Sequence, residues 1–265
     1  MKAAGVRLPV VSRCCGGGGE EGLQAESAEA AREREEREQG RAKELETDLA
    51  SMAAMPIAEL QATLKSAREQ VKDTSAYAEV RGDLDEIDAG LASLQAVRTA
   101  ASEGRAADVV EPALAGFLGV EGVISGRSAR IDAALDDFVK LIERDGPTSE
   151  LEKINRQMDV DRALIGLTKA PYDMSSLVLE IVAKNGTPEM RRAAFDSIAA
   201  SIGQANVGRA RLEHAMRTSY EEEEDEATRK GFAATMARLE VPLEAPEPAQ
   251  TSTAKAAAAK GQPSN

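Results

Sequence analysis

Few side chains in this 265-residue sequence are suited to catalysis or metal binding. His214 is the only histidine, and the only cysteines are the neighbours Cys14 and Cys15. A histidine-based zinc site needs several histidines, and cysteine ligands come in separated pairs, so we expect no metal centre and no cofactor. A cysteine–histidine nucleophilic pair would join the start of the chain to residue 214, although such pairs act only when both groups are held in place. We therefore interpret His214 as a polar-face residue of a helix.

Carboxylates are the abundant reactive group, with 46 Asp and Glu against 33 Lys and Arg and a net charge of −13. Asp159 and Asp161 could combine with Glu150 or Glu152 in a cation or acid–base site. In a chain so rich in charge, an ordinary exposed helix face is the simpler interpretation. The sequence also lacks a phosphate-binding loop, a nucleophile elbow and a dinucleotide fingerprint. We predict that the protein is not an enzyme, and carboxylate chemistry ranks last among the alternatives.

One stretch is acidic at six successive positions: Glu221, Glu222, Glu223, Glu224, Asp225 and Glu226. It lacks the glycine and the alternating Asp/Asn spacing of an EF-hand, so docking of a Lys/Arg-rich protein is favoured over Ca²⁺ binding. The negative net charge argues against binding to nucleic acid or to an anionic membrane. The run therefore predicts a protein partner with a basic surface.

The composition indicates long helices. Trp is absent and aromatic residues make up 3% of the chain, whereas Ala, Glu, Leu and Arg are common, which suits helices packed through Ala, Leu, Ile and Met seams. No apolar run approaches the roughly 18 residues of a membrane span, so no transmembrane segment is expected. We predict an all-α fold, an antiparallel helical bundle with a long coiled-coil-like helix and disordered termini.

The longest apolar pattern extends from Ile57 to Val97, with steps of three and four residues. A six-residue step from Val71 to Tyr77 shifts the seam by one position near Thr74. This spacing predicts a coiled-coil-like helix, although an antiparallel bundle helix would present the same face. We place part of a partner interface on it, at Leu84, Ile87, Leu91 and Leu94.

A helix end and a helix start meet at residues 184–188. Gly186 can adopt the positive φ that closes a helix, Thr187 is an N-cap candidate, and Pro188 suits the first helical position. The two flanking helices should therefore form an αα-hairpin. Asn185 starts an N-glycosylation pattern, but capping by Thr187 explains the same residues.

Other boundary signals divide residues 127–220 into four helices of alternating direction. Residues 145–147 end the first helix, Ser149 with Glu152 forms a capping box, Ala170–Pro171 ends the next, and Asp173 caps the third. Apolar stripes support this division, at Ile131, Leu135, Phe138 and Ile142 and again after Pro188. The last helix continues past Gly203 and Gly208 until the acidic run bends or frays it.

The glycine-rich stretch Gly104–Gly126 predicts a buried connection or a pair of short helices. If a small hydrophobic ligand binds, this region is the candidate pocket, although packing is the simpler explanation.

Four segments follow: a disordered tail or transit segment at 1–26, a charged helix and the coiled-coil-like helix at 27–103, a helical bundle at 104–241, and a disordered tail at 242–265. The basic, acid-free opening has the composition of an organellar transit peptide, so a cytoplasmic and an organellar location both stay open. Palmitoylation of the two cysteines is a further alternative.

These features favour a non-catalytic helical interaction or scaffold protein, an accessory or peripheral subunit of a larger assembly. The seams at 57–97 and 131–216 would supply its core and an interface, and self-association stays open. The alternative is a small-molecule binding module that uses residues 104–126.

Overall fold

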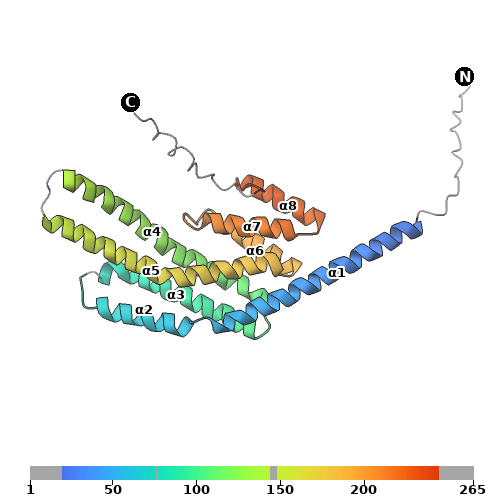
Figure 1. Ribbon diagram of the computed structural model, residues 1–265, viewed down its shortest axis with the longest axis horizontal. Coiled ribbons are helices and arrows are strands. Elements are labelled where there is room, and N and C mark those ends of the chain that lie inside the picture. The colour runs from blue at the N-terminus through green and yellow to red at the C-terminus, as the bar shows by residue number, and fades with distance from the viewer. Residues whose placement is uncertain (1–19, 76, 144–147, 245–265) are drawn as a thin grey trace, which may run out of the picture. The chain divides into compact units, whose positions relative to one another are not determined.

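The computed structural model describes residues 20–75, 77–143 and 148–244, without the side chains of residues 20–27, Ala53 and Thr148. Every regular element in these stretches is a helix, which confirms the all-α prediction (Figure 1). The chain divides into a first compact unit, residues 1–40, and a second, residues 41–265. Most of the two predicted tails and both cysteines lie outside the described residues, although the first helix already begins at Glu20, inside the predicted N-terminal tail.

The described part of the first unit is a charged helix. It belongs to α1 (Glu20–Ser51), and its side chains from Ala28 to Gly40 are exposed apart from the half-buried Glu38. Gln39 donates to Glu35 one turn earlier, at 3.3 Å. A helix without an apolar stripe has no face to bury, so this segment is a solvated helix, as predicted.

The second unit opens with the end of α1, the short helix η1 (Met52–Ala54), and the helices α2 (Ile57–Val71) and α3 (Tyr77–Ser102). The prediction of one long helix over 57–97 is wrong at one point, because the chain turns back between α2 and α3. The register slip near Thr74 marks that turn, where the Thr74 hydroxyl donates to the carbonyl of Val71 at 2.7 Å. Arg68 of α2 then reaches Asp85 of α3 at 2.7 Å, so the two helices form a hairpin.

After η2 (Ala106–Val109), the helices α4 (Val110–Glu143) and α5 (Thr148–Asn185) form a second, longer hairpin. The glycine-rich stretch is therefore mostly one continuous helix rather than a short-helix pair. It is buried where it meets α3, because a Cβ at Gly116 would lie 3.1 Å from Cβ of Ser93 and one at Gly90 would lie 2.7 Å from Cγ1 of Val120. These glycines allow α3 and α4 to approach closely.

The predicted helix end at Ala170–Pro171 is wrong, because α5 continues through Pro171 and Asp173 is helical rather than an N-cap. Pro171 is buried, and its Cβ lies 4.0 Å from the position of a Cβ at Gly90. Burial against α3 offsets the hydrogen bond that proline removes. Ser149 also lies inside α5, which begins at Thr148, and the turn predicted at 145–147 lies outside the described residues.

The joint at 184–188 is confirmed as a helix boundary. Thr187 caps α6 (Pro188–Ser201) by accepting from the amide of Met190, and Pro188 occupies the first turn. Gly186 does not have the predicted positive φ. Glycine is needed there for space, since a Cβ would lie 2.5 Å from the carbonyl oxygen of Val182.

Two further boundaries complete the unit. The predicted continuation past Gly203 and Gly208 is wrong, because α6 ends at Ser201 and α7 (Arg209–Glu222) follows a turn. The predicted break in the acidic run is confirmed, because α7 ends at Glu222 and α8 (Glu226–Arg238) begins at the last residue of the run.

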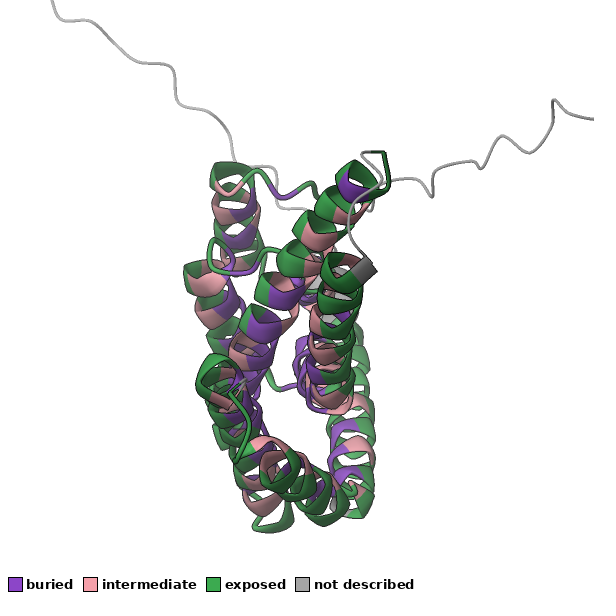
Figure 2. Ribbon diagram, turned by 90° about the vertical axis from the view of Figure 1, so that its left-hand side faces the viewer, coloured by how far each residue is buried: buried purple, intermediate pink, exposed green. Residues whose placement is uncertain are grey.

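Two apolar clusters hold the second unit together. The larger contains residues of the end of α1, of η1 and η2, and of every helix from α3 through α8, including the stacked rings Phe195 and Phe232, whose centroids are 3.8 Å apart. The smaller joins α2, α3 and Leu164 of α5. Buried residues lie on the facing sides of the helices and exposed residues on the outer sides (Figure 2).

Candidate functional site

The leucine and isoleucine side chains assigned to a partner interface are core residues. Leu84, Ile87, Leu91 and Leu94 are each 1% exposed and pack within the smaller cluster. Their regular spacing is accounted for by α2 and α5 of the same chain. A partner could reach them only if this cluster opened.

The acidic run is engaged largely within the chain. Arg41 pairs with Glu222 at 2.6 Å and with Glu224 at 3.2 Å, and Glu223 is 3% exposed. Asp225 caps α8 by accepting from the amide of Thr228 at 2.7 Å. Hydrogen bonds from the side chain and backbone of Thr228 lower the pKa of Asp225 below its ordinary value. Residues of the run therefore form ion pairs with Arg41 of α1 and cap the start of α8.

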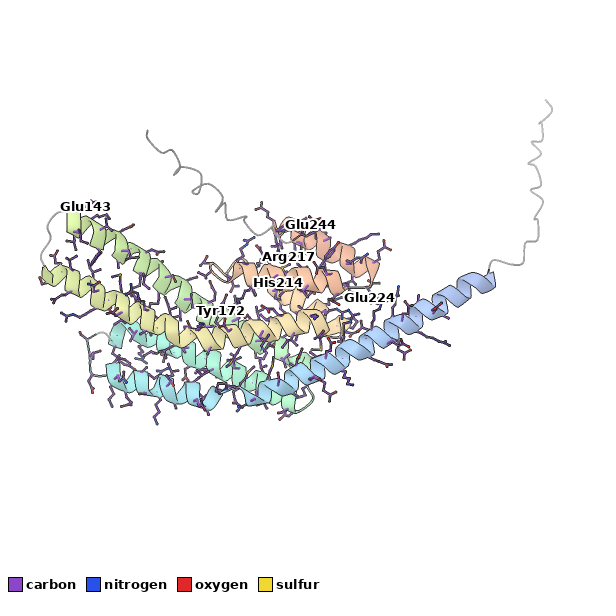
Figure 3. All side chains as sticks on the ribbon, viewed as in Figure 1. Glu143, Tyr172, His214, Arg217, Glu224 and Glu244 are labelled. Carbon is purple, nitrogen blue, oxygen red and sulfur yellow. The ribbon has the colours of Figure 1, made fainter. Side chains whose placement is uncertain are left out.

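His214 is exposed on α7, in agreement with its interpretation as a polar-face residue (Figure 3). In the described part of the chain, His, Cys, Asp and Glu side chains form no group of three that could hold a metal ion. Asn185 is 5% exposed and donates to Asp48 at 3.3 Å, so its amide has a role inside the fold.

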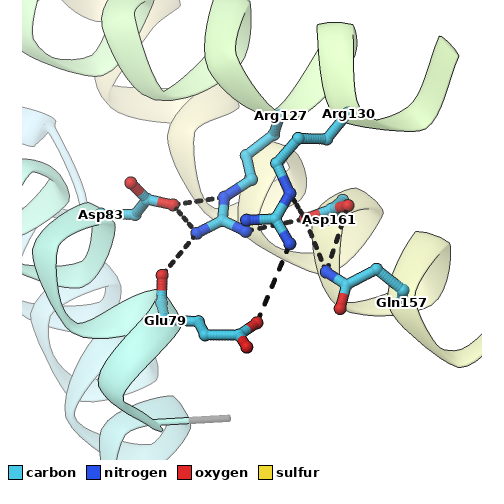
Figure 4. Close-up of polar contacts among 6 residues, drawn as sticks. All are labelled: Glu79, Asp83, Arg127, Arg130, Gln157 and Asp161. Atoms are coloured by element: carbon cyan, nitrogen blue, oxygen red, sulfur yellow. Dashed lines mark hydrogen bonds and ion pairs between the residues drawn. The ribbon is translucent and has the colours of Figure 1, made fainter. Parts of the chain in front are cut away.

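The carboxylate pair Asp159 and Asp161 separates into two environments. Asp159 is exposed, but Asp161 is 0% exposed, so the expected exposed face is wrong for Asp161. It belongs to a set of contacts that we name the Arg127 cluster (Figure 4). The members of the cluster are Glu79, Asp83, Arg127, Arg130, Gln157 and Asp161.

Arg127 is the centre of this cluster and is 4% exposed. Its guanidinium donates to Asp83, to Asp161 at 2.8 Å and to the carbonyl of Glu79 at 3.0 Å. Burial alone would lower the pKa of Arg127, but the hydrogen bonds to Asp161 and Asp83 outweigh it and raise the pKa. The donors of Arg127 are directed at groups of the protein, so the cluster ties α3, α4 and α5 together rather than presenting a charge to a substrate.

The candidate ligand region at 104–126 contains a groove of about 460 Å³ beside Gly122 and Gly126. The carboxylate of Glu121 is 1% exposed there and accepts from the amides of Asn206 at 3.0 Å and Val207 at 2.7 Å. Glu121 therefore holds the turn before α7, a role that the sequence analysis missed. Its lining combines Glu121, Ser125, Gln204 and Asn206 with Leu118, Ala129 and the two glycines, so a ligand there would meet both polar and apolar groups.

An apolar row at the end of the α4–α5 hairpin is the surface that the fold leaves uncovered. The described chain exposes six large apolar side chains, of which Leu135, Val139 and Ile142 lie on α4 and are 43%, 53% and 54% exposed. Steps of four and three residues place them on one helix face. We name these three residues the tip face. The stripe predicted from Ile131 to Ile142 is thus only partly core, since Ile131 and Phe138 are half-buried.

The tip face lies on a stretch of α4 that projects beyond its ion pair with α3. Glu79, in the first turn of α3, lies 3.9 Å from Arg130, and α4 continues beyond this contact to Glu143 (Figures 1 and 3). In this stretch Leu141 is 9% exposed, so the opposite side of α4 is covered. The Arg127 cluster lies at the base of the projecting stretch and fixes it to α3.

Comparison with known proteins adds no functional assignment. No family model matches the chain, and neither a curated protein nor a solved structure matches it significantly. The site must therefore be interpreted from its own geometry.

The hydropathy of α4 bears on a possible membrane location. By length and composition, the helical stretch Ala106–Glu143 could cross a membrane, a property that it shares with core helices of water-soluble proteins. Half of its most apolar window is buried inside the bundle. The buried half of this window is accounted for by packing against neighbouring helices.

Proposed function

We propose that this protein is a non-catalytic helical interaction protein, an accessory or peripheral subunit of a larger assembly, and that it binds its protein partner through the tip face. The observation that supports this proposal is the row formed by Leu135, Val139 and Ile142, each about half exposed. In the described part of the chain, the remaining large apolar side chains that are exposed occur one at a time: Leu177, Val207 and Leu243.

Burial of the tip face would make a useful contribution to binding. Full burial of a Val, Leu or Ile side chain is worth roughly 1.5–3 kcal/mol, so covering the exposed half of each contributes about 1 kcal/mol. The three side chains together supply about 3 kcal/mol, or roughly a 150-fold change in affinity.

The attachment of the hairpin also suits recognition. The Arg127 cluster joins α3, α4 and α5 where the projecting stretch begins, with Arg127 and Asp161 only 2.8 Å apart. A helix that is already held in its binding conformation loses less conformational entropy on association. The same cluster supports a non-catalytic role, since its buried charges neutralise one another.

Crosslinking of the native complex tests this proposal. Tagged full-length protein is isolated from its own cells, crosslinked and analysed by mass spectrometry, alongside a variant with Leu135→Ser, Val139→Ser and Ile142→Ser. The matched control carries Leu177→Ser and Val207→Ser, which remove two exposed apolar side chains elsewhere. We expect a stoichiometric protein with crosslinks to residues 131–143, lost in the tip variant and kept in the control. A partner that is retained equally by both variants, or recovery of the wild-type chain alone, would overturn the proposal.

A further inference from the structure

The residues beside the tip face specify the chemistry of its partner. We infer that the tip face accepts an amphipathic helix with an apolar stripe and flanking Lys or Arg residues. This inference rests on the proposed function and adds the charge and shape of the ligand.

The acidic flank carries the charge argument. Asp132 precedes Leu135 by three residues, Asp136 precedes Val139 by three, and Glu143 follows Val139 by four. Side chains three or four residues apart are neighbours on a helix surface, so these carboxylates line one edge of the apolar row.

None of these three exposed carboxylates forms an ion pair within the described residues. The nearby Lys140 is 3.3 Å from Asp137 and is directed to that residue instead. The edge therefore has an uncompensated negative charge next to an apolar surface, and a partner with the complementary pattern would satisfy both features.

The length and straightness of the row suit a helical ligand. Leu135, Val139 and Ile142 are at i, i+4 and i+7, and with a rise of 1.5 Å per residue they cover about 10 Å, or two helical turns. A row of this length matches the anchor spacing of a second amphipathic helix packed along or across it.

Charge disfavours two other occupants. In a symmetric contact between two copies, the same patch of both copies meets, so the interface would contain two acidic edges and no complementary basic edge. An anionic membrane surface would likewise repel Asp132, Asp136 and Glu143. A basic helix is attracted to the same edge.

The test uses full-length protein and a fluorescently labelled synthetic helix with a leucine stripe flanked by lysines. A second peptide has glutamate in place of every lysine. Fluorescence anisotropy is measured at low and at physiological salt, where screening weakens contacts between exposed charges. We expect saturable binding of the lysine peptide that weakens with salt, and at least tenfold weaker binding of the glutamate peptide.

Two sets of variants separate specific binding from general attraction to an acidic protein. Leu135→Ser, Val139→Ser and Ile142→Ser leave the net charge unchanged and should weaken binding about 150-fold. Asp132→Asn, Asp136→Asn and Glu143→Gln should reduce both the affinity and its salt dependence. The control substitutions Glu46→Gln, Glu111→Gln and Asp196→Asn remove equal charge from other exposed positions and should change affinity less than twofold. Circular dichroism checks that each variant keeps its helicity.

Binding of the lysine peptide that is equal in the tip variant and the wild type would overturn the inference, as would equal effects of the two charge-neutralised sets. Self-association through the tip face in sedimentation, or binding of the tip face to anionic vesicles in place of the peptide, would overturn it as well. If a native partner crosslinks to residues 131–143 while the lysine peptide fails to bind, the inference is wrong and the proposed function stands. If the native partner contacts another surface, the proposed function itself fails.

Discussion

Replacement of Arg127 by Met should destabilise the second unit more than any other single change in the Arg127 cluster. Arg127 is 4% exposed, and it is the group closest to Asp161, which is 0% exposed. Methionine keeps most of the aliphatic volume but has no charge and no donor. The substitution therefore leaves the carboxylate of Asp161 buried, with only Gln157 at 3.4 Å and Arg130 at 3.7 Å nearby.

The expected cost follows from the burial of Asp161. Removal of one partner from a buried ion pair costs roughly 3–5 kcal/mol, because an uncompensated charge stays inside the protein. Arg130 can replace part of the lost attraction, so we expect the lower end, about 3 kcal/mol. In a chain of this size 1 kcal/mol shifts Tm by roughly 2–4 °C, so the loss corresponds to about 6–12 °C.

Urea unfolding of the full-length chain, followed by far-UV circular dichroism, measures this change as a lower midpoint at constant slope. Arg130→Met is the matched control. The Arg130 side chain is 43% exposed, and surface ion pairs contribute only about 0–1 kcal/mol. The double variant Arg127→Met with Asp161→Leu removes both buried charges and should recover most of the loss. A cost below about 1 kcal/mol for Arg127→Met, or a double variant no more stable than the single one, would refute the assignment of buried-charge stabilisation.

Three further outcomes follow from local geometry. Thr187→Ala removes the N-cap of α6 and should lower the free energy of unfolding by about 1 kcal/mol in the same urea assay. Gly90→Ala places a Cβ 2.7 Å from Val120 and should cost about 1–3 kcal/mol of folding stability. In contrast, the Cβ of Gly126→Ala meets no atom within 4 Å, and this substitution should stabilise α4 by up to about 1 kcal/mol. Thermal melting of both variants measures the two effects, and equal effects would contradict the packing argument. Because the folded-state pKa of Asp225 is depressed below 3.8, its contribution to stability is present above that pH and is lost as pH falls through the folded value. Asn also caps helices well, so the stability difference between wild type and Asp225→Asn reports the carboxylate charge. This difference should thus shrink in acid, and a difference that is constant with pH would exclude a lowered pKa of Asp225.

The sequence predicted those helix boundaries that are set by residues adjacent in the chain. The residues of the joint at 184–188 are adjacent in the chain, and the N-cap of α6 follows directly from Thr187 and Pro188. The turn between α2 and α3 was missed because Lys72 to Ser75 contain neither glycine nor proline. The break predicted at Pro171 failed because burial against α3 outweighs the local cost of proline.

The Arg127 cluster could not be deduced from the sequence for a different reason. Arg127 and Asp161 are 34 residues apart and lie on separate helices. Either residue alone resembles the many exposed charges of this chain, so only the packing of α4 on α5 distinguishes them. Glu121 is a similar case, since its hydrogen-bond donors are backbone amides 85 and 86 residues further along the chain.

The tip face shows that regular spacing of apolar residues along a helix does not by itself distinguish core residues from interface residues. Residues 84–94 and 135–142 have the same steps of three and four, yet the first set is buried and the second is half exposed. The difference arises from position, because residues 84–94 pack against α2 and α5, whereas residues 135–142 lie where α4 continues beyond its ion pair with α3 at Arg130. A short amphipathic helix from a partner would cover this apolar row, and the acidic edge at Asp132, Asp136 and Glu143 would favour a basic helix for that position.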